Sequence, residues 1–405
     1  MSTIAMLEPP ERTVENAAAL LELSIIMPCL NEAETLETCI RKAQAFLERH
    51  GVHGEVIIGD NGSTDGSQDI ARRCGARVVD VKVRGYGAAL YHATLAARGK
   101  YVIMGDSDDS YDFSDLMPLL TELRAGRELV VGNRFKGGVK PGAMPWKNRY
   151  IGNPILSGLG RLFFQCPVRD FHCGLRGYSV EAFRRMDLQT TGMEFASEMV
   201  IKATLLRMNI AEAPTTLSPD GRSRPPHLRP WRDGWRHLRF MLLYSPRWLF
   251  LYPGLLLMLL GLGVGAWLLP QPRQVGGTVF DVHTLLYAAA AFLLGFQTCI
   301  FAVLARAFMA SRKLLPESKR LTWVLRYSSL ELGVIVGVGL ILAGLGGSAA
   351  AVWGWGAHSF GPLDPSVTLR IAIPSVLALL AGSEVVLCSL LLGVMRLPLH
   401  TWKQS

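Results

Sequence analysis

The sequence predicts a soluble α/β domain, followed by an all-α transmembrane domain of about four helices. Two observations carry this prediction. Up to about Arg247 the 405-residue chain mixes charged, glycine and apolar residues as soluble α/β proteins do, whereas long apolar runs dominate from Trp248 onward. Within the first part, short apolar runs alternate with segments of helical spacing, which is typical of a doubly wound parallel sheet.

The expected strands and helices follow one another along the chain. An apolar run at 24–28 ends in a polar loop, and the next segment, 34–49, has apolar residues at helical spacing. The same alternation predicts further strands and helices. The strands are 55–59, 76–81 and 101–104, and the helices are 68–74 and 87–97. Because ligands of such sheets bind at the carboxyl ends of the strands, we expect the site in the loops there.

Four apolar stretches are each long enough to cross a hydrocarbon core of roughly 30 Å. They cover residues 249–269, 284–309, 330–354 and 368–395. We therefore expect five parts in the chain. These are an N-terminal extension (1–22), the α/β domain (23–220), an amphipathic interfacial segment (221–248), a transmembrane domain (249–396) and a tail (397–405).

The interfacial segment is rich in arginine and aromatic residues. Its arginines are Arg222, Arg224, Arg229, Arg232, Arg236, Arg239 and Arg247, and its aromatic residues are Trp231, Trp235, Phe240, Tyr244 and Trp248. This mixture is typical of a segment that lies against anionic lipid headgroups. This segment contains much of the excess of basic over acidic residues that gives the chain its net charge of +9. We therefore expect a membrane, and no nucleic acid, as the partner. A solvated basic linker is the alternative.

The distribution of positive residues predicts the orientation in the membrane. Basic residues between the second and third apolar stretches and after the fourth are Arg312, Lys313, Lys319, Arg320, Arg326, Arg396, His400 and Lys403. The opposite loops hold only Arg273 before the stretch that begins near Arg370. By the positive-inside rule, both termini and the α/β domain lie in the cytosol of a multi-pass cell-membrane protein.

Residues 1–23 do not have the pattern of a secretory signal. The seven cysteines have no zinc-binding spacing, as expected of reduced cytosolic thiols.

An acidic cluster follows the predicted strand 101–104 directly. It begins with the triplet Asp106-Ser107-Asp108 and continues with Asp109 and Asp112. Hard divalent cations prefer oxygen ligands, and one or two carboxylates together with diphosphate oxygens are enough to hold Mg²⁺. We therefore expect this cluster to hold Mg²⁺ or Mn²⁺, where the cation would stabilise a departing nucleoside diphosphate.

Further motifs lie in the loops on either side of this cluster. They are Pro28-x-x-Asn31-Glu32, Asp60-Asn61-Gly62-Ser63-x-Asp65-Gly66, Arg84-Gly85-Tyr86-Gly87-Ala88-Ala89, Gly132-Asn133-Arg134 and Asp170-Phe171-His172-Cys173-Gly174-Leu175-Arg176. With Asp106-x-Asp108, they make residues 23–216 resemble glycosyltransferase family 2, and within it the polyprenyl-phosphate glycosyltransferases related to dolichyl-phosphate mannose synthase. The resemblance implies a GT-A fold, an inverting transfer and a metal ion on the two aspartates.

The same resemblance implies which residues bind donor and acceptor. The nucleotide sugar is expected on Pro28, Leu30, Asn31, Glu32, Asp60, Asn61, Gly85, Asp106 and Ser107. A polyprenyl phosphate is already ionised near neutral pH, so arginines that position and screen it should line the acceptor side. The acceptor set is Arg134, Arg149, Asn153 and Arg176. The expected catalytic residues are Asp106, Asp108, Arg134 and Arg149.

The chain departs from this family pattern in two places. Relatives often carry a metal-assisting glutamine where this chain has Ser110, and Asp109 or Asp112 would be the substitute ligand. Relatives also often have a second aspartate at the position of Asn61. Further along, Glu194 or Glu198 would either orient the sugar or lie on a helix surface.

The expected reaction is transfer of a hexose, glucose or mannose, from a UDP- or GDP-sugar to a polyprenyl phosphate at the cytosolic membrane face. Self-association into a homo-oligomer stays open. The alternatives are a processive membrane polysaccharide synthase and a non-catalytic lipid-carrier scaffold or transporter. Processive enzymes usually have a Gln-x-x-Arg-Trp motif, which this sequence lacks. A dinucleotide-binding dehydrogenase is excluded, because Gly85-Tyr86-Gly87 lacks the third glycine of that fingerprint.

Overall fold

A computed structural model describes residues 21–223, 230–312, 314–315 and 330–395. The expected extension at 1–22, the tail at 397–405 and most basic residues of the loop after Arg312 therefore lie largely or wholly outside the described residues. The chain divides into two compact units. The first comprises Met1–Arg161 with Gln165–Gly234, and the second comprises Leu162–Phe164 with Trp235–Ser405.

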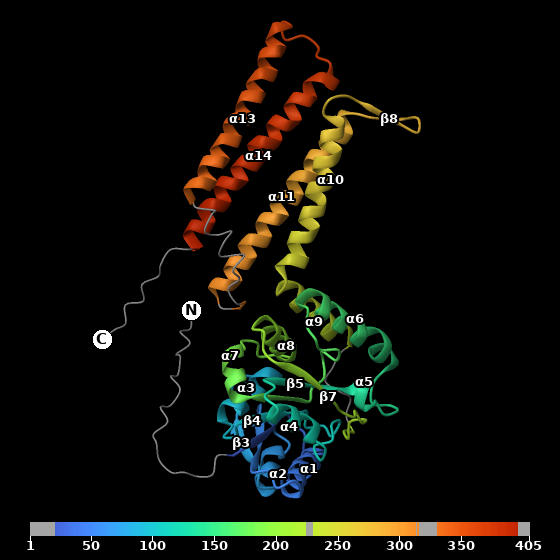
Figure 1. The fold of residues 1–405 in the computed structure, drawn as a ribbon, viewed down its shortest axis with the longest axis vertical. Helices are drawn as coiled ribbons and strands as arrows, with labels where there is room; N and C mark the ends of the chain where they lie inside the picture. The colour runs from blue at the N-terminus through green and yellow to red at the C-terminus, as the bar shows by residue number, and fades with distance from the viewer. Residues whose placement is uncertain (1–20, 224–229, 313, 316–329, 396–405) are drawn as a thin grey trace, which may run out of the picture. The chain divides into compact units, whose positions relative to one another are not determined.

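The first unit is built around a seven-stranded sheet with the order β3-β2-β1-β4-β6-β5-β7 (Figure 1). Its strands are β1 (Leu23–Cys29), β2 (Gly54–Asp60), β3 (Arg77–Asp80), β4 (Tyr101–Met104), β5 (Leu129–Asn133), β6 (Arg176–Ser179) and β7 (Ile210–Pro214). β6 runs antiparallel to both of its neighbours, whereas the other pairings are parallel. The four strands predicted from the sequence, β1 to β4, are parallel as expected, and the sheet as a whole is mixed because β6 pairs with β4 and β5 in the opposite direction.

Helices α1 (Leu36–Arg49), α2 (Ser67–Arg73), α3 (Tyr86–Ala96), α4 (Met117–Arg124), α5 (Arg134–Gly137) and α7 (Val180–Met186) pack against the sheet. The remaining helices of this part of the chain are η1 (Asn148–Gly152), α6 (Asn153–Phe164), α8 (Phe195–Leu205) and α9 (Pro230–Leu243). The helical spacing in α1 places Leu36, Ile40 and Ala43 in the core, where each is fully buried. β1 and β4 are buried on both faces, as expected for central strands of an α/β sheet.

Strand register brings the site loops together. In the parallel pair β1–β2, Cys29 lies opposite Asp60, so both strands end at the same level. β4 runs parallel to β1 on its other side, and its last residue, Met104, lies opposite Ile26. The loops after β1, β2 and β4 therefore leave the same edge of the sheet, as the sequence predicted.

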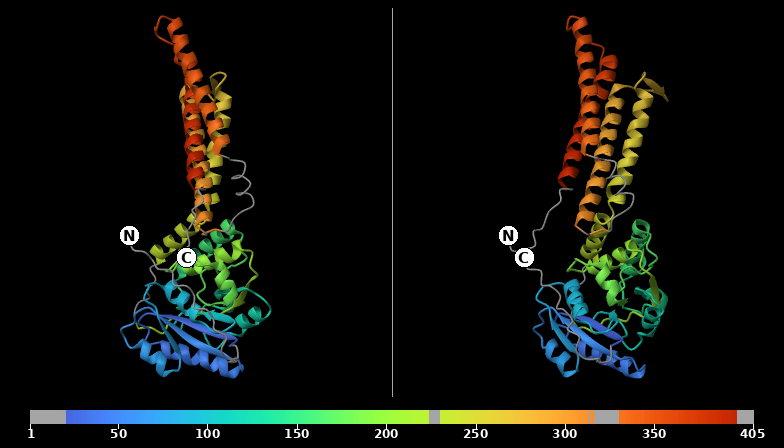
Figure 2. Two further views of the ribbon diagram at one scale, coloured as in Figure 1. Left: turned by 90° about the vertical axis from the view of Figure 1, so that its left-hand side faces the viewer. Right: turned by 60° about the vertical axis from the view of Figure 1, so that its left-hand side comes forward.

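Among the described residues of the second unit, four helices are long and apolar enough to cross a membrane. They span Arg247–Leu268 (η2, Arg247–Leu251, continued by α10, Tyr252–Leu268), Val282–Ser311 (α11), Leu330–Ala357 (α13) and Pro365–Met395 (α14). A hairpin of β8 (Arg273–Val275) and β9 (Thr278–Phe280) joins α10 to α11. Figure 2 shows from two further sides that these helices run alongside one another.

Candidate active site

The loops after β1 and β4 are tied to each other by the side chain of Ser107. Its hydroxyl donates to the carbonyl of Pro28 (2.7 Å), and its own carbonyl accepts from the Thr35 hydroxyl (2.7 Å). Leu30 lies in the same β1 loop and is 42% exposed. The predicted donor residues Leu30 and Ser107 thus lie in two connected loops, and Pro28, near the end of β1, is bonded to them through Ser107.

The loop after β1 is also bonded to the loop after β2. The Thr64 amide donates to Oδ1 of Asn31 (2.8 Å), and the Glu32 amide donates to the Ser67 hydroxyl (3.0 Å). Asn31 itself has φ = 59°, a left-handed conformation that asparagine tolerates better than most residues. These bonds fix the relative position of Asn31 and Glu32 at the edge of the sheet.

Asp60 is fully buried at the end of β2 and uses one carboxylate oxygen to shape its loop. Oδ2 accepts from the Gly62 amide (3.0 Å), the Ser63 amide (3.1 Å) and the Gln68 side chain (2.6 Å). Oδ1 is buried and has no hydrogen-bond partner among the described residues. A buried acceptor without a partner is unusual, so this oxygen is a candidate contact for a ligand donor.

The side chain of Asn61 serves the protein itself. It donates to the carbonyls of Val81 (3.0 Å) and Val83 (2.8 Å), and its oxygen accepts from the Gly85 amide (2.6 Å). These bonds hold the chain between β3 and α3 against the β2 loop. Asn61 and Gly85, both predicted to bind the nucleotide, thus have a structural role that the sequence did not indicate.

Asp106 and Asp108 lie side by side after β4. Oδ1 of Asp106 accepts from the Tyr86 hydroxyl (2.9 Å), and a Cβ on Gly174 would lie only 2.5 Å from Oδ2. Oδ1 of Asp108 accepts from the Ser110 amide (3.1 Å). Burial, and then the neighbouring Asp108 carboxylate, raise the pKa of Asp106 to about 6.

Arg222 reaches into this acidic group from the segment after β7. Its guanidinium donates to Glu32 (3.0 Å) and to Oδ2 of Asp108, and it lies 3.6 Å from Asp220. The Gly221 amide also donates to the carbonyl of Asp108 (2.9 Å). The sequence predicts that Arg222 faces the membrane, and this prediction is wrong, because the Glu32 and Asp108 carboxylates of the site neutralise its charge.

The candidates for a third metal ligand are engaged elsewhere. Asp109 forms an ion pair with Lys42 (2.7 Å), and Oδ1 of Asp112 accepts from the amide and hydroxyl of Ser114. Ser110 is buried. Within the described parts of the chain, no group of three or more histidine, cysteine or acidic side chains is arranged to hold a metal ion.

Asp106 and Asp108 nevertheless suit a divalent cation that takes its other ligands from a diphosphate and water. The absence of a Cβ on Gly174 makes room for one Asp106 oxygen, and the Tyr86 hydroxyl orients the other. Arg222 already donates to Oδ2 of Asp108, so a cation on this carboxylate would lie beside the guanidinium or take its place.

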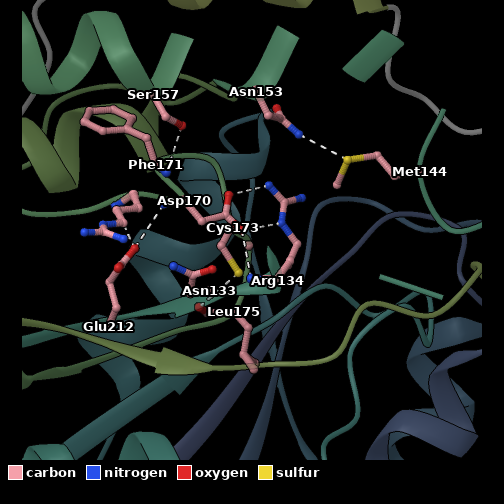
Figure 3. Close-up of polar contacts among 12 residues, drawn as sticks. Asn133, Arg134, Met144, Asn153, Ser157, Asp170, Phe171, Cys173, Leu175 and Glu212 are labelled. Atoms are coloured by element: carbon pink, nitrogen blue, oxygen red, sulfur yellow. Dashed lines mark hydrogen bonds and ion pairs between the residues drawn. The ribbon is translucent and has the colours of Figure 1, made fainter. Parts of the chain in front are cut away.

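Arg134 is held by a buried carboxylate (Figure 3). Its Nε and Nη2 donate to the two oxygens of Asp170 (2.8 and 2.7 Å), and its amide donates to Oδ2 (3.0 Å). The amide of Asp170 in turn donates to Glu212 (3.0 Å). This bidentate pair fixes the guanidinium at the start of α5, directly after β5.

Arg149 and Asn153 lie on η1 and at the start of α6, outside this network. The Arg149 guanidinium lies 5.4 Å from the centre of the Tyr150 ring. Asn153 donates to the sulfur of Met144 (3.3 Å), as Figure 3 shows. The hydrogen bonds found among the described residues connect neither side chain to the Asp106–Asp108 pair, so their place at the acceptor side stays a prediction.

Arg176 does not line a surface. It is fully buried in β6, and its guanidinium donates to the backbone carbonyls of Cys173 (2.8 Å), Phe171 (3.0 Å) and Ala196. The prediction that it contacts the acceptor phosphate was therefore wrong. Its donors are used to hold the segment that carries Gly174 against α8.

Glu198 is not a surface residue. It is fully buried in α8 and accepts from the amides of Gln189 and Thr190 and from the Thr190 hydroxyl (2.7 Å). Lys202 is its ion-pair partner (2.9 Å). The interpretation of Glu198 as a helix-surface residue was therefore wrong, because its buried carboxylate anchors the loop before α8.

Sequence reasoning missed Arg222, Asp170 and the hydroxyl of Tyr86 as parts of the site. Tyr86 and Asp170 lie inside the motifs at 84–89 and 170–176, so the sequence indicates their positions but not their roles. Arg222 had no such signal. Its partner Asp108 is 114 positions away, a pairing that only the fold reveals.

Acidic groups that meet at the carboxyl ends of a mixed α/β sheet, in a chain with apolar helices, fit a membrane-bound enzyme that acts on a nucleotide-linked substrate. Residues 24–187 match the glycosyl transferase family 2 model, and residues 303–396 match the glycosyltransferase family 2 C-terminal transmembrane region. The chain belongs to glycosyltransferase family 2. This confirms the predicted family, the glycosyltransferase class and a GT-A domain followed by membrane helices.

Several proteins of Haloferax volcanii resemble this chain. The low-salt glycan biosynthesis hexosyltransferase Agl6 is 36% identical over 92% of this chain and 88% of its own length. A dolichyl-phosphate hexose transferase is 30% identical over 48% of this chain and 81% of its own length. Among solved structures, glucosyl-3-phosphoglycerate synthase from Mycobacterium tuberculosis is 24% identical over 55% of this chain and 78% of that chain, with a TM-score of 0.43.

Proposed function

We propose that this glycosyltransferase moves one hexose from a UDP- or GDP-sugar to a polyprenyl phosphate at the cytosolic face of the membrane. The observation that carries the proposal is the pair Asp106 and Asp108 at the end of β4, beside the loops after β1 and β2, in a chain with four candidate membrane spans. A donor site and a lipid acceptor fit this combination.

On the donor side, the nucleotide sugar would lie along the loops that contain Leu30, Asp60 and Ser107. The buried Oδ1 of Asp60 is an acceptor that an N–H group of the base can use. Asp106 and Asp108 would hold Mg²⁺ or Mn²⁺, which neutralises the diphosphate as it leaves. Tyr86 and Gly174 keep the Asp106 carboxylate in place for that ion.

On the acceptor side, Arg134, Arg149 and Asn153 would position the lipid phosphate. A phosphate monoester is largely ionised at neutral pH, so it needs orientation more than a strong general base. Asp170 holds Arg134 in one orientation before any ligand arrives. Pre-organised guanidinium groups lose little freedom when they bind a phosphate.

The membrane helices and the charge pattern support the location. A polyprenyl phosphate is confined to the bilayer, so an enzyme that uses it benefits from its own membrane anchor. The basic residues of the loop after Arg312 favour a cytosolic α/β domain. One relative is itself named a dolichyl-phosphate hexose transferase, and another a hexosyltransferase of glycan biosynthesis.

The test is transfer of label into lipid by the purified full-length protein. We would incubate it with Mn²⁺, a polyprenyl phosphate and radiolabelled UDP-glucose or GDP-mannose, and count the organic phase. Asp108→Ala should abolish lipid label, whereas Asp115→Ala, which removes an exposed carboxylate from the same loop, should retain it. Absence of lipid label with every nucleotide hexose tried would contradict the proposal.

A further inference from the structure

We infer that Tyr86 is a positioning residue for the proposed metal site, fixing the Asp106 carboxylate through its hydroxyl. This inference rests on the proposed function, since it assigns Asp106 to the cation that the transfer uses. The Tyr86 hydroxyl donates to Oδ1 of Asp106 at 2.9 Å. A phenol is protonated and neutral at physiological pH, so it orients a carboxylate without replacing the cation.

The opposite side of the Asp106 carboxylate is confined as well. Oδ2 lies so close to Gly174 that a Cβ there would come within 2.5 Å of it, and within 3.2 Å of the Tyr111 ring. The Arg176 guanidinium donates to the carbonyl of Cys173 and so fixes the backbone next to Gly174. The carboxylate is therefore held between a hydrogen-bond donor on one side and a closely packed backbone on the other.

Tyr86 has little freedom to withdraw, because it is the first residue of α3 and both neighbours are closely packed glycines. Gly85 has φ = 137°, and a side chain there would overlap the carbonyl of Thr191. A Cβ on Gly87 would lie 2.6 Å from Cβ of Phe195 and 2.7 Å from the carbonyl oxygen of Thr190. The start of α3 can lie this close to the loop before α8 only with glycine at both positions.

That loop is in turn anchored in the protein interior. The Ala88 amide donates to the carbonyl of Thr191 (3.1 Å), and Thr190 donates to the buried Glu198 through both its amide (2.8 Å) and its hydroxyl (2.7 Å). Lys202 balances the charge of Glu198. A continuous set of contacts therefore runs from α8 through the start of α3 to the carboxylate of Asp106.

Groups that orient metal ligands strongly affect the affinity of the site for the metal ion. Their loss typically weakens metal binding by about 10- to 100-fold. We would measure Mn²⁺ binding to the full-length protein by the paramagnetic resonance of free Mn²⁺, with and without UDP or GDP. Tyr86→Phe removes only the hydroxyl and should weaken Mn²⁺ binding about tenfold. The matched control is Tyr91→Phe, which removes a hydroxyl from the same helix, where the ring lies 5.5 Å from that of Phe183.

A kinetic measurement separates positioning from a general loss of structure. Tyr86→Phe should raise the Mn²⁺ concentration needed for half-maximal transfer, leave the KM for polyprenyl phosphate unchanged, and recover most of its kcat at saturating Mn²⁺. Its thermal unfolding temperature should match that of Tyr91→Phe.

Wild-type Mn²⁺ affinity in Tyr86→Phe would overturn the inference while leaving the proposed function intact. A wild-type protein that binds no Mn²⁺ under any of these conditions would instead contradict the metal assignment on which the proposed function depends. The two failures are therefore distinguishable in the same titration.

Discussion

Arg222 donates to Asp108, one of the two carboxylates on which we propose a divalent cation. The guanidinium pairs with Asp108 and with Glu32, and its side chain is 10% exposed, so its charge already neutralises part of the site. We predict that Arg222→Gln binds Mn²⁺ more tightly than the wild type in the absence of nucleotide. Removal of a competing positive charge should gain roughly tenfold, about 1.4 kcal/mol.

The control for Arg222→Gln is Arg72→Gln, which removes an exposed guanidinium paired with Asp69 on α2. This variant should bind Mn²⁺ as the wild type does. Weaker Mn²⁺ binding by Arg222→Gln would mean that the arginine supports the carboxylates and does not compete with the cation.

The raised pKa of Asp106 has a consequence for stability in the absence of metal. Its pKa in the folded protein, about 6, lies above its ordinary value of 3.8, so ionisation destabilises the fold as pH rises above 3.8, and the full cost is present above pH 6. Asp106→Asn should therefore raise the unfolding temperature of the metal-free protein, by more at pH 8 than at pH 5. The gain at pH 8 is at most about 3 kcal/mol. Equal gains at both pH values in thermal unfolding would contradict this account.

Single side chains were the least predictable level from the sequence. The order of the motifs along the chain, and the residue types in them, predicted that Asp60, Asp106, Asp108 and Arg134 lie at the edge of the sheet. The sequence did not indicate that the Arg176 guanidinium donates to buried backbone carbonyls. The identity of a residue does not show whether its side chain faces a ligand or the core. Burial and partner decide that, and both come from the fold.

At the scale of elements, the strand and helix positions expected for the first 104 residues correspond closely to β1 through β4. Apolar runs and helical spacing specify these elements locally. The antiparallel β6 was not predicted, because strand direction depends on pairing between β4, β5 and β6, which are distant in sequence. The four apolar stretches likewise correspond to the four candidate spans, since length and hydropathy alone define them.

The packing of α13 against α14 depends on glycine. A Cβ on Gly337 would lie 2.6 Å from Val386 and 2.8 Å from the carbonyl oxygen of Gly382, whereas Gly339 on the same helix has no atom within 4 Å. We predict that Gly337→Ala lowers stability by about 1–3 kcal/mol, because the helices have to separate. Gly339→Ala should be neutral or stabilising, since alanine is the better helix former.

Thermal unfolding of the two variants in the same detergent compares them directly. Because both changes add one methyl group to one helix, any difference between them reports on the α13–α14 contact. Equal unfolding temperatures would contradict the assignment of Gly337 to this packing position.

At the scale of the whole molecule, the proposed orientation can be tested in intact cells. Thr278→Cys places a thiol in the exposed β8–β9 hairpin, and Glu48→Cys places one at the exposed end of α1. A membrane-impermeant maleimide should label Thr278→Cys in intact cells and Glu48→Cys only after permeabilisation, with the wild type as background. The reverse pattern would place the α/β domain outside the cytosol.

The identity of the lipid product tests the central claim most directly. Purified protein, Mn²⁺, a nucleotide hexose and a defined polyprenyl phosphate would be incubated together, and the organic phase analysed by mass spectrometry. We predict a product with one hexose on a lipid monophosphate, which is absent when Asp108 is replaced by alanine. A product with several sugars, or a nucleotide sugar consumed with no change in the lipid, would contradict single transfer to a polyprenyl phosphate.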